Sequence, residues 1–452
     1  MRRAPARNSI PLIAALCLAC LTGAGNAKDM IDYFLPIPNT SPLTSNTWGD
    51  PNVLPRDTTN GLETPNKSFF YWDGKVIKTK DGKYHLHCSR WPKNGGFNQW
   101  ASSITVHAIS ESLLGPYIDK GPIYSRNSSR GHNVSNLELP DGSFAVYTSD
   151  ITPGDFYTAP AIEGPWTFKG SMNINYNGYN IPWPTANICV IVRPDSTFLA
   201  TQRSGYMYVG GKELLGPYIT SSPCVWPTIS GLDNSRAEDP VLWYSGGYYH
   251  ITVNWWDSRI AHHLMSKDGV TGWKDMGVAY DPRAGFIRYT NGTVNKWNNL
   301  ERPGVVMENG HVVAFTFAAT DIDKSSITGT DNHCSKIIVV PFDGVAFDAD
   351  NGGSDAVGPG KNARHKGVYL KTSLQSRERS LLSIEYSIPQ PEQVIVTVHD
   401  LSGKKIAVIV NKHLNAGKFY QTLNADDISH GCKVIKLRAG ANTEVRVVNA
   451  GL

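Results

Sequence analysis

The sequence has few charged residues and only one long apolar run. Charged side chains make up 18% of its 452 residues, and the formal net charge is +4. No basic cluster of the kind that binds nucleic acid is present. The apolar run, residues 10–21, is too short to span a bilayer stably, and no other stretch suggests a membrane span. These absences argue against nucleic-acid-binding proteins and helical membrane proteins.

Cysteine is also scarce for a chain of this length. Of the seven cysteines, two lie within the first 20 residues. The other five are widely spaced and form no CxxC pair: Cys88, Cys189, Cys224, Cys334 and Cys432. An odd number at such spacing is not a disulfide framework. Buried thiols, a single bridge, or one soft metal ligand remain as alternatives.

Residues 1–27 have the pattern of a secretory signal peptide. Arginines 2, 3 and 7 precede the apolar run 10–21, and Gly25-Asn-Ala27 offers small residues for cleavage. We therefore predict a secreted protein, extracellular or periplasmic. Lipidation at Cys20, which would attach it to the cell surface, is the alternative, although Cys17 fits that motif poorly. Removal of the leader would take three arginines away and leave a net charge of about +1.

Glycine, proline and aromatic residues are abundant, with 42 Gly, 28 Pro, 20 Tyr and 12 Trp. This composition favours an all-β protein with many turns. One sequence pattern recurs five times: a polar residue or pair, a short apolar strand, a tight turn and an alternating strand. The polar positions are Asp73, His132 with Asn133, Asn187, Glu238 with Asp239, and Glu301 with Arg302, and the turns lie at 81–82, 141–142, 194–195, 246–247 and 309–310.

Copies spaced by roughly 50 to 60 residues predict a β-propeller with one four-stranded blade per copy. Five copies are visible, and the loops 171–184 and 281–299 leave six or seven blades open. A β-sandwich of scattered hairpins is the alternative fold. In a propeller, the polar residues before each innermost strand would surround a single funnel mouth.

The chain divides by composition into five parts. Residues 28–66 are expected to lead into the first blade or to close the ring, 67–345 to form the propeller, and 346–380 to be a linker. Clean alternation in 381–452 predicts a small C-terminal β-sandwich. Its phrases VHDLSGKK (398–405) and LNAGKFY (414–420) resemble modules that end many secreted bacterial hydrolases, including sorting domains of outer-membrane secretion systems. That resemblance implies attachment or export, with secretion machinery as a partner.

Two resemblances concern the activity of the propeller. Tyr71-Trp-Asp73 and Glu238-Asp239-Pro240 resemble family-43 glycoside hydrolases, which implies hydrolysis with Asp73, Glu238 or Asp239. Where that family places further acidic residues, this chain has Asn133 and Asn187.

The segments 88–92, 103–110, 114–117 and 131–133 resemble propeller polysaccharide lyases, including ulvan lyases and enzymes that act on rhamnosyl-glucuronic acid units. This second resemblance implies β-elimination at a uronate of an acidic polysaccharide. It implies that His107 and His132 act as the acid and base. A tyrosine from the 173–183 loop is expected to assist them, and Tyr179 is preferred to Tyr176. Arg203 is expected to neutralise the substrate carboxylate. Further substrate contacts are expected from Asn133, Asn187, Trp183, Arg236, Glu238, Arg259 and Arg302.

The chemistry of elimination explains these residue types. Removing the C5 proton requires that the neighbouring carboxylate be neutralised, which a bidentate arginine does well. Histidine titrates near neutral pH and suits either proton transfer. The structural alternatives are that His107 packs within its strand and that Arg203 pairs with Glu238 or Asp239 to lock adjacent blades. A non-catalytic carbohydrate-binding propeller is the third functional hypothesis.

No cofactor is required by the sequence. A structural zinc site that uses His250, His333 and Cys334, or a calcium ion on the propeller axis, is an alternative, although no compact metal-binding spacing occurs.

Overall fold

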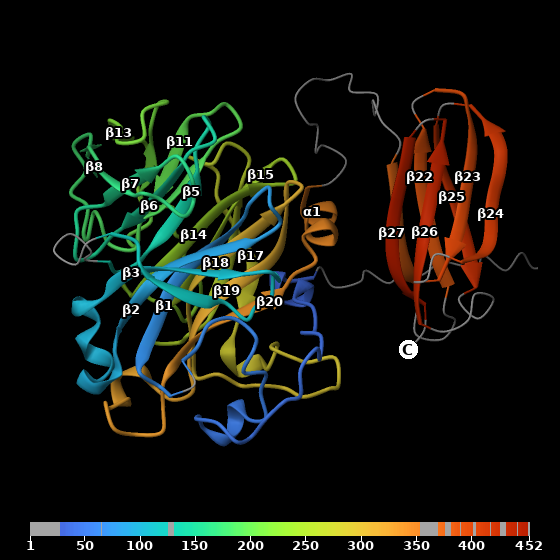
Figure 1. The fold of residues 1–452 in the computed structure, drawn as a ribbon. Coiled ribbons are helices and arrows are strands. Elements are labelled where there is room, and N and C mark those ends of the chain that lie inside the picture. The colour runs from blue at the N-terminus through green and yellow to red at the C-terminus, as the bar shows by residue number, and fades with distance from the viewer. Residues whose placement is uncertain are drawn as a thin grey trace, which may run out of the picture. The chain divides into compact units, whose positions relative to one another are not determined.

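The computed structural model describes residues 28–64, 66–124, 131–352, 369–375, 381–388, 390–400, 404–415, 417–424, 431–440 and 442–450. The predicted signal peptide, 1–27, lies outside these residues. The chain forms two compact units, 1–353 and 354–452 (Figure 1). No helix in the described part of the chain is both long and apolar enough to cross a membrane.

The first unit contains five antiparallel sheets, called blades I to V here. Blade I is β1 (Phe69–Lys78), β2 (Tyr84–Pro92), β3 (Ile104–Ser110) and β4 (Ile118–Pro122). Blade II is β5 (Ser135–Glu138), β6 (Phe144–Thr148), β7 (Asp155–Ala159) and β8 (Thr167–Ser171). Blade III is β10 (Cys189–Val192), β11 (Phe198–Thr201), β12 (Met207–Val209) and β13 (Tyr218–Thr220), with the short β9 (Ile174–Asn175) parallel to β13.

Blade IV is β14 (Ala237–Ser245), β15 (Tyr248–Trp255), β16 (Ala261–Ser266) and β17 (Lys274–Tyr280). Blade V is β18 (Asn299–Glu308), β19 (His311–Thr320) and β20 (Ser335–Pro341). The helix α1 (Gly344–Gly352) follows it. Short 3₁₀ helices occupy the connections: η1 (Met30–Tyr33), η2 (Pro51–Val53), η3 (Lys93–Gly95), η4 (Phe97–Ser102), η5 (Asn234–Arg236), η6 (Pro282–Ala284) and η7 (Lys324–Ser326).

The first strands of the blades form a closed ring. β1 contacts β5, β5 contacts β10, β10 contacts β14, β14 contacts β18, and β18 returns to β1. The five predicted turns each join the first two strands of a blade. The predicted β-propeller is therefore confirmed, and the described residues supply five blades.

The N-terminal segment closes the ring at blade V, which has only three named strands. Leu62 forms an antiparallel bridge with Ile337 of β20, through hydrogen bonds of 2.9 and 3.0 Å. Leu62 thereby occupies the outer edge where a fourth strand would lie. Farther upstream, Phe34 bridges Phe342 and packs into the same aromatic cluster. The segment before the first blade thus joins the beginning of the chain to the last blade.

The second unit is a β-sandwich, as predicted. One sheet has the order β21 (Tyr369–Gln375), β22 (Leu381–Ile388) and β25 (Gly417–Asn424). The other has the order β24 (Lys405–Leu414), β23 (Glu392–His399), β26 (Gly431–Ala439) and β27 (Asn442–Ala450). Buried side chains from both sheets share one core, including Leu370, Ile384, Val396 and Leu437. The range predicted as a linker, 346–380, contains most of α1 and all of β21.

Buried histidines form hydrogen-bonded stacks within two blades. In blade I, His107 lies between His85 and His87 with nearly parallel rings, and its Nε2 is 3.0 Å from His85 Nδ1. In blade IV, His250 Nδ1 is 2.9 Å from His263 Nε2. Burial lowers the pKa of His107 and of His250 to about 4. These imidazoles therefore stay neutral in the folded protein at pH values where free histidine is already protonated.

We expect the free energy of unfolding of the propeller to fall as the pH is lowered from 6.5 toward 4. In that range the unfolded chain binds protons that the buried imidazoles exclude. For His107, the shift from 6.5 to about 4 corresponds to about 3 kcal/mol. Denaturant unfolding at a series of pH values should therefore show a shallower pH dependence for His107→Gln than for the wild type.

The matched control is His413→Gln, because His413 is exposed in the second unit. This variant should keep the wild-type pH dependence of propeller unfolding. Equal slopes for His107→Gln and the wild type would contradict the account.

Candidate functional site

Five residues at equivalent positions surround the propeller axis where the innermost strands begin. Each has left-handed backbone geometry: the φ values are 61° for Asp73, 51° for Asn133, 49° for Asn187, 56° for Asp239 and 47° for Arg302. Among residues with a side chain, asparagine and aspartate adopt this conformation most readily. The backbone therefore explains why four of the five repeats carry Asp or Asn here. In blades I, IV and V the strand register also shifts at this point, as at a β-bulge.

Arg302 is the exception in this ring, and its guanidinium lies between two carboxylates. Its Nε is 3.3 Å from Asp73 Oδ1, and its Nη1 is 3.6 Å from Asp239 Oδ1. All three side chains are buried. The attraction of these carboxylates outweighs burial and raises the pKa of Arg302 above its ordinary value. Blade V is thereby tied to both of its neighbours, blades I and IV.

The acidic side chains also accept hydrogen bonds from the backbone of the following blade. Asp73 Oδ2 accepts one from Val134 N–H at 3.2 Å, and Asp239 Oδ2 accepts one from Arg302 N–H at 3.3 Å. Between blades II and III, Asp150 Oδ2 accepts one from Asn187 N–H at 3.2 Å. These contacts hold the starts of neighbouring innermost strands at the same height.

A cavity of about 380 Å³ opens above this ring. Its volume falls in the range of roughly 300 to 1,000 Å³ typical of ligand pockets. Trp72, Trp100 and Trp183 supply aromatic surface. Trp183 is 68% exposed and has a φ of 53°, which is strained for a bulky residue. Such strain is most common at functional positions.

Three carboxylates cluster on the wall formed by blades IV and V. Glu238, Asp239 and Glu301 each offer an oxygen within 4.8 Å of the others. Burial raises the pKa of Glu238 to about 8, with Asp239 and Glu301 adding to the effect and Lys324 and Arg203 opposing it. Burial also raises the pKa of Asp239, although Arg302 opposes this. Burial and the neighbouring carboxylates thus both favour the protonated form of Glu238.

Two cationic side chains lie close to these carboxylates. Lys324 Nζ forms an ion pair with Glu301, and Arg203 Nη2 lies 3.7 Å from Glu238 Oε2. Lys324 also lies 5.4 Å from the centre of the Trp72 ring. Since fixed cations neutralise these carboxylates, the cluster gives no reason to infer a bound metal ion.

Asp150 stands on a different wall of the cavity, between blades II and III. Burial raises its pKa, while Arg302, the Asn187 N–H and His132 favour its ionised form. His132 lies beside it in the lining, 4.6 Å from Trp100 between ring centres, with Nδ1 3.3 Å from Ser103 Oγ. The carboxylates of the cavity thus approach its space from more than one direction.

The structure brings eight of the residues proposed from sequence together in the cavity lining: His132, Asn133, Trp183, Asn187, Arg203, Glu238, Asp239 and Arg302. His107 is not among them. It lies in the histidine stack of β3, four residues beyond Ser103, which corresponds to about 13 Å of strand. The lyase hypothesis requires His107 and His132 in one cleft, and the structure does not place them so.

Three further candidates also lie away from the lining. Tyr179 stacks edge-to-face on Tyr206 at 5.7 Å, and the Arg236 guanidinium lies 4.6 Å from the Trp256 ring centre. Arg259 pairs with Asp323 at 2.5 Å and lines a separate cavity with Asp321. Each therefore has a local partner outside the site.

The proposed metal ligands do not converge. His250 is bonded to His263 inside blade IV. His333 Nδ1 lies 2.5 Å from Asp321 Oδ2, and Cys334 Sγ lies 3.5 Å from the Phe69 carbonyl. These contacts are hydrogen bonds of packed side chains. They correct the expectation of a zinc site that combines the three residues.

Asp150 and Lys324 have no role in the hypotheses drawn from the sequence, and Glu301 enters them only as a repeat position. Asp150 ends the hairpin strand of the second repeat, so a search for polar residues before each strand misses it. Lys324 comes from η7 in the connection between β19 and β20, and no repeat marks it. A search for polar residues at both ends of each hairpin would have found Asp150.

No protein-family model matches the chain. No curated protein matches it either. Solved structures similar to it include Zg3597, a family 117 glycoside hydrolase from the marine bacterium Zobellia galactanivorans, with 14% identity, a TM-score of 0.45, and coverage of 63% of this chain and 88% of that one.

A second is CoXyl43, a GH43 β-xylosidase/α-arabinofuranosidase from a compost microbial metagenome, with 12% identity, a TM-score of 0.44 and coverage of 63% and 94%. A third is the GH43 β-1,3-galactosidase BT3683, with 13% identity, a TM-score of 0.41 and coverage of 66% and 94%. At these identities and scores, function has to be argued from the site itself.

We expect Arg302→Met to destabilise the propeller by about 3 to 5 kcal/mol, because it leaves the buried Asp73 and Asp239 without their cation. Urea unfolding measures the change. Arg203→Met is the matched control: its side chain is 27% exposed and lies 3.7 Å from Glu238, so its loss should cost less than about 1 kcal/mol. Equal costs for the two variants would show that Arg302 does not hold the ring together.

Proposed function

We propose that the propeller hydrolyses glycosidic bonds, with Glu238 as the proton donor and Asp150 as the general base. The observation that carries the proposal is the cavity at the axis, where carboxylates on two different walls face a space with tryptophan surface. Glycoside hydrolysis uses two carboxyl groups that flank the bond, one protonated and one ionised. Tryptophan rings provide flat apolar surface for the C–H faces of sugars.

Glu238 suits the donor role because it can keep its proton at neutral pH. Burial raises its pKa to about 8, as is common for catalytic acids that work near neutrality. In the proposed reaction the Glu238 carboxyl gives its proton to the leaving oxygen while the C–O bond breaks. Asp239 and Glu301 remain as the neighbouring charges that make Glu238 a weak acid before substrate binds.

Asp150 suits the base role by its position and its surroundings. The other cavity carboxylates gather within 4.8 Å of one another, whereas Asp150 belongs to the boundary of blades II and III. Burial raises the pKa of Asp150, whereas the Arg302 charge and the Asn187 N–H oppose this effect and favour its carboxylate form. From there it would accept a proton from the attacking water as that water adds to the sugar.

The charge of the lining favours a neutral sugar over a uronate. Four acids line the cavity, Asp150, Glu238, Asp239 and Glu301, and three bases, Arg203, Arg302 and Lys324. With Glu238 protonated, three charges of each sign remain. Elimination at a uronic acid would need a free cation to neutralise the substrate carboxylate, and no surplus cation is left in this lining. We therefore propose neutral glycans as substrates in place of the acidic polysaccharide expected from the sequence.

Secretion and a sorting or attachment role for the C-terminal sandwich remain predictions. They agree with an enzyme that acts on glycans outside the cytoplasm. Comparing the exported protein with and without residues 354–452 would test the role of the sandwich.

The proposal predicts different kinetic behaviour for two variants. Glu238→Gln should lower kcat by about 10² to 10⁴-fold on a natural glycan or alkyl glycoside. On a dinitrophenyl glycoside, whose leaving group needs no proton, the loss should be much smaller. Asp150→Asn should lower kcat on both substrates alike. A panel of neutral pentosides and hexosides, assayed by released aglycone and reducing ends, provides the measurement.

His107→Gln is the control for the competing hypothesis, because it should leave hydrolysis unchanged. An ultraviolet-absorbing unsaturated product from uronate-containing glycans, lost in His107→Gln, would overturn the hydrolase proposal in favour of elimination. Full activity of Glu238→Gln on the alkyl glycoside would remove Glu238 from the proposed role.

The pH dependence should follow the same assignment. A general acid must be protonated, so kcat/KM should fall as the pH rises through the raised pKa of Glu238, about 8. In Glu238→Gln this alkaline limb should disappear from the residual activity on the dinitrophenyl glycoside. An unchanged alkaline limb in that variant would assign the titration to another group.

A further inference from the structure

A second cavity, also of about 380 Å³, lies at the opposite end of the propeller axis. The same innermost strands line it, but with residues farther along each strand. β1 contributes 75–78, β5 contributes 137–138, and β14 contributes 242–244, with further side chains from β10 and β18. The first cavity lies at the starts of these strands, so the two openings are at different ends of the molecule's axis.

The wall of this second cavity is largely apolar. Leu137, Ile191, Leu242 and Val305 are each buried and surround its interior. Met307 adds a flexible thioether that can adapt to the shape of a ligand. Such a lining favours an apolar molecular body, in contrast to the charged cavity at the other end.

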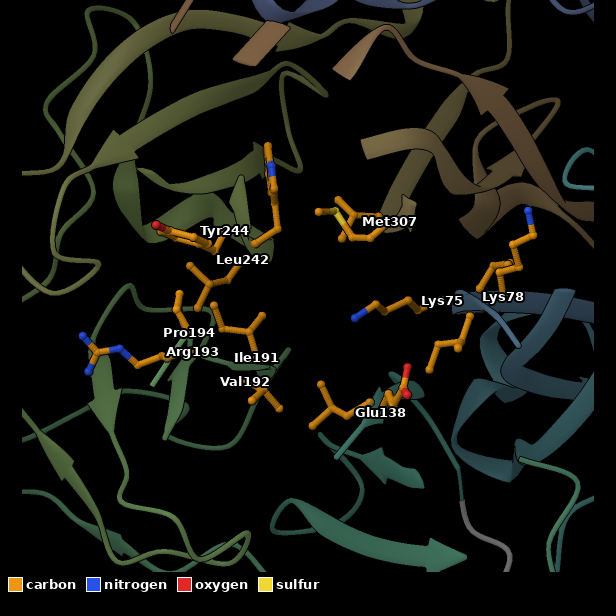
Figure 2. A pocket seen from close by; sticks show the side chains of 15 residues that line it. Lys75, Lys78, Glu138, Ile191, Val192, Arg193, Pro194, Leu242, Tyr244 and Met307 are labelled. Carbon is orange, nitrogen blue, oxygen red and sulfur yellow. The ribbon is translucent and has the colours of Figure 1, made fainter. Parts of the chain in front are cut away.

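One cation projects into this apolar space. Figure 2 shows the Lys75 side chain extending toward the middle of the cavity, between Met307 and Ile191. Lys75 Nζ has no hydrogen-bond or ion-pair partner among the residues that the structure describes. The rim cations differ, because Lys78 pairs with Glu308 at 2.8 Å and Arg193 Nε donates to the Tyr249 hydroxyl at 3.1 Å. Lys75 is thus the cation of this cavity for which a ligand would supply an ion-pair partner.

Behind Lys75 the axis is nearly closed. A gap of only about 20 Å³ separates it from Arg302 and is lined by both side chains, which is room for about one water molecule. Lys75 therefore marks the inner end of the apolar cavity. A ligand that enters from the open side would meet its ammonium last and could not pass through to the other cavity.

We propose that this cavity binds a small monocarboxylic acid with an apolar body, its carboxylate on Lys75 and its body against the ring of aliphatic side chains. One ammonium matches one carboxylate. Phosphate sites, in contrast, gather several backbone N–H groups at a helix N-terminus or nest, and here the innermost strands use their backbone groups in the blades. The binding site is separate from the proposed hydrolase site.

The protonation of Lys75 should be coupled to binding. Burial lowers the pKa of Lys75 and the Cys189 thiol opposes this effect, while Glu138 is the carboxylate in the same lining. A carboxylate bound at Lys75 would raise its pKa again. By linkage, affinity for the carboxylate should fall as the pH rises through the Lys75 pKa, while affinity for a neutral analogue should not.

Calorimetric titration of the full chain with octanoate and with octanamide tests the proposal. Octanoate should bind the wild type, and Lys75→Met should weaken it at least tenfold while octanamide binds as well as before or better. Lys78→Met is the matched control, because Lys78 is a rim lysine paired with Glu308, and it should leave both affinities unchanged. Glu238→Gln should also leave octanoate binding unchanged.

Three outcomes would overturn the proposal: no binding of octanoate to the wild type, equal octanoate affinity for the wild type and Lys75→Met, or displacement of octanoate by inorganic phosphate. If Lys75→Met does not fold, the pH series on the wild type decides. Octanoate affinity that does not fall at alkaline pH would then reject Lys75 as the anion partner.

Discussion

The rest of this propeller depends on the ion pairs that the Arg302 guanidinium forms with two buried carboxylates. The guanidinium lies between Asp73 and Asp239, at 3.3 and 3.6 Å, on the axis where the blades meet. A buried ion pair does not by itself imply extra stability, because desolvation offsets much of the attraction. Removing one partner, however, leaves uncompensated charge in the interior. The same group therefore joins the last blade to its neighbours and sets the electrostatics of the cavity above it.

The fold and the site share one structural cause. A residue in left-handed geometry lies in the first half of each innermost strand or just before it. Asp and Asn tolerate that geometry, so the repeat that builds the ring also places polar groups around one opening. The residue before each such position faces the cavity in four blades: Trp72, His132, Glu238 and Glu301. Farther along the same strands most side chains are apolar, and Lys75 extends into the cavity that they line; the other charged lining residues are Lys78, Glu138 and Arg193.

Much of the fold could be predicted from the sequence because its signals are local. The turn at 141–142 and its equivalents lie where the hairpins form, and their spacing implies a ring of blades. The closing contact of Leu62 with Ile337 joins residues 275 positions apart, and no local pattern marks it. For the same reason, residues of the site that no local pattern marks could not be predicted from the sequence. Glu238 stands out in a repeat, whereas Lys324 comes from a connection whose position only the folded chain defines.

His107 shows why a residue pattern can mislead. It lies in a strand segment that resembles a catalytic one, but the register places it opposite His87, and its ring stacks on both His85 and His87. Strand alternation predicts which side of the sheet it faces, but not whether that side opens to solvent or packs against the next blade.

We propose that Glu238 keeps its proton in the axial cavity while Asp150, on a different wall, is ionised. Infrared difference spectroscopy of the wild type against Glu238→Gln, titrated from pH 5 to 9, measures this directly. We predict a protonated-carboxyl band that is absent from the variant and that disappears in the wild type only as the pH approaches about 8. A spectrum in which Glu238 is already ionised at pH 5 would contradict it.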